Sequence, residues 1–257
     1  MIAGASLVFL LLGGVAEDRA AAPLIGRPDL ADGFESLPRL AGDTGAARQF
    51  EHLTGALDAT GAAQRDHCFA EAPASSQWSR SVSVPMAGPK FASLVIRDDT
   101  SCGDAQTRIT EMRMTYDLRT GDTIDWPDVL PADLIEPRDP ADTLEFLYEA
   151  TVRSKALVAW HTDHVLDTMD AQTRLDCKDR IAELAISNGL HIWLDAQRGG
   201  LAMAPALLRQ DTSTCGQSSV MPTDELRRKG VSAELADAID AAHRDLGWAA
   251  HASELPR

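Results

Sequence analysis

The chain has 257 residues, of which 44% are hydrophobic and 25% are charged, a composition typical of a folded protein. This composition excludes wholesale disorder and a fibrous repeat. Acidic residues outnumber basic residues by 39 to 24, so the net charge is -15. A chain of this charge repels polyanions on average. We therefore expect no binding to nucleic acid, and we expect a basic partner to be electrostatically favoured.

The first apolar segment, residues 2–16, carries no charge. As a helix it would rise about 22 Å, which is less than the ~30 Å hydrocarbon core of a membrane but typical of a secretory signal. Residues 14–16, Gly-Val-Ala, fit a cleavage site, although no Lys or Arg lies near the first residue. We predict a signal peptide over 1–16, a tether over 17–36, and a periplasmic or secreted protein. The alternative is a buried helix of a cytosolic protein. No later segment is apolar enough to predict a transmembrane span.

Four cysteines, Cys68, Cys102, Cys177 and Cys215, lie far apart and form no C-x-x-C motif. An even number of cysteines in an exported chain indicates two disulfides. Three pairings are possible. We favour the pairs that are close in sequence, Cys68–Cys102 and Cys177–Cys215. The alternative is four buried free thiols.

The first predicted helix begins at Asp43 and ends at Gly61, because apolar residues recur at helical spacing after a capping residue. Residues 78–126 then predict a β-meander. Its strands are WSRSVSVPM, FASLVIR, a long alternating strand, and a returning strand with Ile124 and Trp126. Gly121 suits the positive φ of the last turn.

The second half begins with a predicted helix at 140–156, followed by an acidic, less regular segment at 161–182. The strands LHIWLD and LAMAP predict a hairpin, and two closing helices start at Thr223 and Ser232. The pattern predicts an α+β fold: an antiparallel meander packed with helices in one disulfide-tied domain over 37–250. The helix–hairpin half spans about 140–210, and 251–257 form a tail.

The stretch from Trp78 to Pro131 contains WSRSVSV, FASLVI, a Cys-Gly turn and MTYDLRTGDTIDWPDVLP. It resembles a family of bacterial extracytoplasmic domains of unknown function, found in the lysozyme-sensing anti-sigma factor and beside the catalytic domain of a peptidoglycan deacetylase. The matching hairpin positions are Asp117, Leu118, Thr120 and Gly121.

The later helix and the segment HIWLDAQRGGLAMAP resemble the C-terminal half of that family, so the resemblance covers roughly 37–210. Many relatives carry a Gly-Gly-Ala-His-like turn where this chain has residues 102–106, Cys-Gly-Asp-Ala-Gln. Any role of that histidine therefore does not carry over. Nothing in the chain resembles the deacetylase catalytic domain. The resemblance implies an envelope-facing module and no known reaction.

Two groups of residues are candidate sites. His161 and His164 are three residues apart and could face one metal from a helix, but no third or fourth ligand can be identified. The ordinary interpretation is a solvated, acidic helix end. His191, Trp193 and Asp195 alternate on one strand and could line a polar ligand-binding groove. The ordinary interpretation is a solvent-facing strand side with one tucked tryptophan.

No nucleophile elbow or nucleotide-binding motif is present, and no carboxylate pair stands out, so we name no catalytic residue and expect no cofactor. Glu111 and Asp117 lie on a strand pattern where charges usually face solvent. The sequence thus favours a non-enzymatic binding module of the cell envelope, whose partner is a basic protein or a cell-wall component. The alternatives are an envelope glycan hydrolase or deacetylase-like enzyme that uses carboxylates or His161 and His164, and a purely structural envelope protein.

Overall fold

The computed structural model describes residues 24–71, 74–103, 107–136, 151–206, 214–246 and 248–249. Helices and antiparallel sheets form one compact α+β fold, as predicted. The predicted signal peptide and the tail after residue 250 lie outside the described residues.

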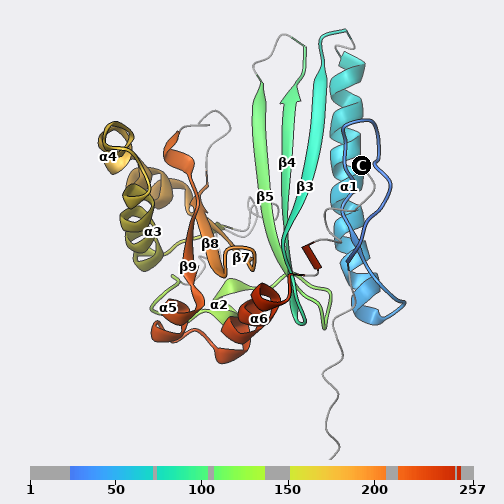
Figure 1. The fold of residues 1–257 in the computed structure, drawn as a ribbon. Coiled ribbons are helices and arrows are strands. Elements are labelled where there is room, and N and C mark those ends of the chain that lie inside the picture. The colour runs from blue at the N-terminus through green and yellow to red at the C-terminus, as the bar shows by residue number, and fades with distance from the viewer. Residues whose placement is uncertain are drawn as a thin grey trace, which may run out of the picture.

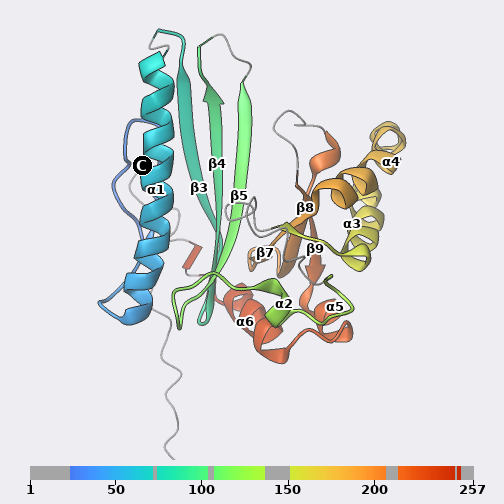
Figure 2. The same cartoon turned by 180° about the vertical axis from the view of Figure 1, so that it is seen from behind.

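The first sheet contains three long antiparallel strands, β3 (Gln77–Ala87), β4 (Phe91–Ser101) and β5 (Arg108–Asp117), in the order β3-β4-β5. Helix α1 (Gly45–Glu71) runs along the length of this sheet (Figures 1 and 2). The core between them is apolar, and the rings of Phe50 and Tyr116 lie 4.7 Å apart within it. Burial of these side chains holds the helix on the sheet.

The predicted end of α1 at Gly61 is wrong, because the helix continues to Glu71. Gly61 instead makes room for a neighbour: a Cβ atom there would lie 2.2 Å from Nη2 of Arg80. The predicted returning strand is wrong at Trp126, which begins the short helix α2 (Trp126–Val129) with a proline in its first turn. Before α2 the chain does return beside β5, through an antiparallel bridge between Thr123 and Tyr116 and a hydrogen bond from the Ile124 N–H to the Thr115 carbonyl. Gly121 does adopt the expected positive φ, 83°.

The second sheet has the order β6-β7-β8-β9, formed by β6 (Thr151–Val152), β7 (Leu190–Asp195), β8 (Gly200–Pro205) and β9 (Ser219–Pro222). Its central hairpin, β7–β8, was predicted. The predicted helix at 140–156 is wrong at Thr151–Val152, which pair as a strand with β7; β-branched residues suit a strand. The rest of that prediction up to residue 150 lies outside the described residues.

The segment predicted to be less regular forms two helices, α3 (Lys155–Asp167) and α4 (Ala171–Asn188). Each begins at a side-chain cap: Ser154 accepts a hydrogen bond from the Leu157 N–H, and Asp170 accepts from two N–H groups of the first turn of α4. These two helices lie on the far side of the second sheet from the first sheet (Figures 1 and 2).

The closing helices are α5 (Thr223–Arg228) and α6 (Ala233–Arg244). Ser232 caps α6 as predicted, with its hydroxyl accepting from the Leu235 N–H. Thr223 does not cap α5, because its hydroxyl donates to Asp240. Leu246, which follows the end of α6, is 43% exposed.

The described part of the predicted tether, residues 24–36, packs on the domain and is not a free linker. Strand β1 (Leu24–Ile25) pairs with β2 (Arg39–Leu40), and Phe34 is completely buried. The Phe34 ring lies 4.4 Å from the guanidinium carbon of Arg80. Burial of this aromatic ring stabilises the attachment of the segment.

Both predicted disulfides are present. Cys68–Cys102 joins α1 to the end of β4, and Cys177–Cys215 joins α4 to a short 3-10 helix at Thr214–Gly216. All four cysteines are thereby bonded. Two disulfides in one chain are typical of a protein that folds outside the reducing cytosol. Across the described parts of the chain, no helix has the length and apolar character needed to cross a membrane.

Candidate functional site

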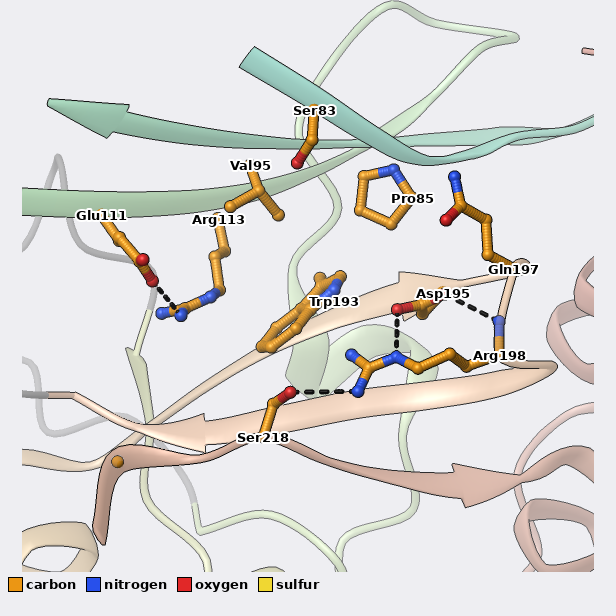
Figure 3. A pocket seen from close by; sticks show the side chains of 11 residues that line it. Ser83, Pro85, Val95, Glu111, Arg113, Trp193, Asp195, Gln197, Arg198 and Ser218 are labelled. Atoms are coloured by element: carbon orange, nitrogen blue, oxygen red, sulfur yellow. Dashed lines mark hydrogen bonds and ion pairs between the residues drawn. The ribbon is translucent and has the colours of Figure 1, made fainter. Parts of the chain in front are cut away.

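A cavity of about 380 Å³ lies between the two sheets (Figure 3). One wall comes from the first sheet and contributes Ser83, Pro85, Val95, Glu111 and Arg113. The opposite wall comes from β7, the β7–β8 turn and the segment before β9, and contributes Trp193, Asp195, Gln197, Arg198, Gly216 and Ser218. The volume is that of a small-molecule site.

The two walls are held together at one end of β7 by polar contacts. The Pro85 carbonyl accepts hydrogen bonds from the backbone N–H groups of Ala196 (3.1 Å) and Gln197 (3.4 Å). Deeper in the core, the Leu194 N–H donates to the hydroxyl of Ser93 at 3.2 Å. Because these contacts involve backbone groups, they fix the position of β7 against the first sheet.

Trp193 lies at the centre of the cavity, with an arginine on either side (Figure 3). Its side chain is largely enclosed, and the residue is 4% exposed. The guanidinium carbon of Arg113 lies 4.7 Å from the indole ring centroid, and that of Arg198 lies 6.0 Å from it. Both distances fall in the range of cation–π attraction. The indole therefore helps to hold two positive charges in one cavity.

Each arginine also has a carboxylate partner. Arg198 donates from Nε to Asp195 Oδ2 at 2.7 Å and from Nη1 to the Ser218 hydroxyl at 3.0 Å. The Arg198 N–H donates to Asp195 Oδ1 at 2.9 Å. Arg113 forms an ion pair with Glu111, which Arg97 also contacts at 3.3 Å. Both carboxylates that line the cavity are thus engaged by guanidinium groups.

Arg113 is the more enclosed of the two arginines, with 12% of its side chain exposed against 43% for Arg198. Burial lowers the pKa of Arg113, the Glu111 charge opposes this shift, and the nearby Arg198 charge lowers the pKa further. The Nε atom of Arg113 is buried and has no hydrogen-bond partner. That N–H is shielded from solvent, so a ligand in the cavity does not reach it, and the other N–H groups of Arg113 are the ones that matter for binding.

Two of the three residues predicted to line a groove, Trp193 and Asp195, do line this cavity, while His191 lies beyond its lining. His191 and Trp193 are each 4% exposed and Asp195 is 5% exposed, so this side of the strand does not face solvent. Burial, together with the charge of Arg113, lowers the pKa of His191 to about 3. His191 is therefore neutral at physiological pH.

His161 and His164 do not converge on a common point. His161 is completely buried, and its Nδ1 atom lies 2.6 Å from the Ser219 hydroxyl. His164 places Nδ1 2.7 Å from the Trp160 carbonyl and stacks on the indole of that residue. Among the residues that the structure describes, no three potential ligands are grouped to hold a metal ion.

Sequence reasoning missed both arginines of the site. Arg113 and Glu111 alternate on β5 with the apolar Met112 and Met114, and we expected charges in this pattern to face solvent. They face the second sheet instead, since β5 packs beside β7. The alternation on β5 places Glu111 and Arg113 on one face of the strand. It does not reveal that β7 covers this face, so the sequence alone could not identify them as site residues.

No protein-family model and no curated protein matches this chain. The family resemblance inferred from the hairpin motif therefore stays a prediction, and the geometry of the cavity carries the functional argument.

Proposed function

We propose that this protein is a non-enzymatic binding module of the cell envelope and that the cavity between the two sheets is its ligand site. The observation that carries the proposal is the arrangement of Trp193 between Arg113 and Arg198 in a cavity of about 380 Å³. An aromatic platform with a few convergent polar groups is typical of a small-ligand site. The two disulfides support a location outside the cytosol.

The ion pairs formed by the carboxylates of the cavity favour binding over hydrolysis. A glycan hydrolase needs a carboxyl group that can give up a proton near neutral pH. Asp195 and Glu111 each form an ion pair with an arginine, so neither faces the cavity as a free carboxyl group. Asp58 has a pKa raised by burial, but it contacts Arg80 and the Leu37 N–H and does not line the cavity.

The cavity favours a cell-wall component over a basic protein as the ligand. The net charge of -15 would attract a basic protein to the outer surface. Inside the cavity, however, Arg113 and Arg198 lie beside Trp193, and each has more N–H donors than its hydrogen bonds to Glu111, Asp195 and Ser218 use. A ligand that supplies acceptors satisfies them, whereas a cationic side chain does not.

Blocking the cavity tests this proposal. Ser83 is exposed on β3 and lines the cavity, so Ser83→Trp should fill it without disturbing the core. Ser79 is an exposed serine on the same strand that does not line the cavity, and Ser79→Trp is the matched control. Purified protein is cosedimented with insoluble cell-wall material, and release of soluble sugar is assayed in parallel.

We expect the wild type and Ser79→Trp to cosediment and Ser83→Trp to remain in solution, with no sugar released. Equal cosedimentation of both variants would contradict the assignment of the cavity. Cell-wall turnover by the wild type would contradict the non-enzymatic proposal. Retention of all three proteins at low salt that disappears in high salt would also contradict the assignment, because it indicates a surface charge effect.

A further inference from the structure

We infer that the cavity recognises a single carboxylate group on a small polar ligand, and this inference rests on the proposed function. The carboxylate would lie between Arg113 and Arg198, beside the Trp193 ring. Such a group occurs on an acidic sugar and at the C-terminus of a short peptide. Both are within the size that a cavity of about 380 Å³ admits.

The first argument is the balance of donors and acceptors. A guanidinium has five N–H donors. Arg113 donates to Glu111 from Nη2 alone, and Arg198 uses Nε and Nη1. Asp195 accepts at both of its oxygens. The surplus is on the donor side, and a planar carboxylate matches a guanidinium fork with two parallel hydrogen bonds.

The second argument is electrostatic. Arg113 and Arg198 approach the same indole ring, and the Arg198 charge contributes to lowering the pKa of Arg113. Arg113 is also largely desolvated. A negative group between the two guanidinium groups relieves their repulsion and replaces the water that Arg113 has lost.

The third argument limits the charge of the ligand. The four charged residues that line the cavity are two arginines and two carboxylates, so their formal charges cancel. The whole chain adds a field of net charge -15. A monoanion therefore fits this site better than a dianion such as HPO4²⁻, because each further negative charge meets Glu111 and Asp195 without a new cation.

Matched pairs of ligands test the inference by isothermal titration calorimetry on the full chain. N-acetylmuramic acid and N-acetylglucosamine differ by one carboxylate-bearing ether group. N-acetyl-D-alanine and its amide differ only in the C-terminal charge. Inorganic phosphate, measured above its second pKa so that HPO4²⁻ predominates, is the dianion control. We expect the charged member of at least one pair to bind about 10-fold or more tightly than its neutral partner, the magnitude of a charge-assisted hydrogen bond.

The pair that shows this preference identifies the source of the carboxylate. Arg198→Gln should weaken its binding about 10-fold and leave the neutral member unchanged. Arg228 lies on α5 with 69% of its side chain exposed and does not line the cavity, so Arg228→Gln is the matched control. Circular dichroism checks that both variants are folded.

Equal binding of the charged and neutral members in both pairs would overturn the inference, and so would tighter binding of phosphate. If cell-wall cosedimentation is still lost in Ser83→Trp while no carboxylate is preferred, the proposed function stands and the ligand chemistry is wrong. If neither experiment responds to a cavity variant, both the function and the inference fail.

Discussion

The two buried histidines should make the protein less stable in mildly acidic solution. His191 is 4% exposed and its pKa is lowered to about 3, first by burial and then by the Arg113 charge. In the unfolded chain its pKa returns to the ordinary value of about 6.5. The folded state therefore stays neutral while the unfolded state binds a proton, and the stability contributed by neutral His191 is complete above pH 6.5 and is lost as the pH falls toward 3.

The magnitude follows from proton linkage. Each pH unit between the two pKa values changes the free energy of unfolding by about 1.4 kcal/mol. Lowering the pH from 7 to 5 crosses roughly 1.5 units of this window, so His191 should account for a loss of roughly 2 kcal/mol. His161, whose pKa is lowered to about 4 by burial and by His164, adds a loss of the same sign.

Urea unfolding followed by tryptophan fluorescence at pH 7 and pH 5 measures this loss. His191→Gln should lose about 2 kcal/mol less than the wild type over that interval. His52 is exposed on α1, and His52→Gln is the control that should lose as much as the wild type. The burial argument is refuted if His191→Gln and His52→Gln show the same dependence on pH.

Three further predictions concern stability. Arg80→Met should destabilise the fold by about 3–5 kcal/mol in urea unfolding, because Asp98 would remain buried without its partner; a loss below about 1 kcal/mol would show that this pair is dispensable. Gly61→Ala should cost about 1–3 kcal/mol in the same assay, since the added Cβ meets Arg80, and should cost less in an Arg80→Met background. Cys177→Ser should lower stability by about 3–4 kcal/mol by releasing the 38-residue loop to Cys215; four reactive thiols in denatured, unreduced wild type would contradict the disulfide.

The features that the sequence predicted correctly depend on local patterns. The strand LHIWLD follows a glycine and turns at Gly199, so its length and its hairpin are specified within about a dozen residues. The cap at Ser232 is local in the same sense, whereas the disulfide Cys68–Cys102 joins residues 34 positions apart and was favoured only as the shorter of the possible pairings. For the hairpin and the cap, neighbouring residues supply most of the constraint.

The errors arose where a distant residue decides the structure. A glycine normally weakens a helix, but Gly61 is required inside α1 because Arg80 from β3 occupies the space of a side chain. Thr151–Val152 form a strand because β7 offers a pairing edge. Arg113 becomes a site residue only because β7 covers its face of β5.

Contacts within the second sheet and its turns order Arg198 before any ligand arrives, and this leads to a last prediction. Arg198 donates hydrogen bonds from its backbone N–H and from Nε to the Asp195 carboxylate, and from Nη1 to the Ser218 hydroxyl. Lysine keeps the charge but not the planar fork, so it cannot make these contacts and still meet a carboxylate. Arg198→Lys should therefore lose about as much affinity for the preferred carboxylate ligand as Arg198→Gln, roughly 10-fold by calorimetry. Wild-type affinity in Arg198→Lys would mean that the site reads charge alone, and that the geometry set by Asp195 has no part in recognition.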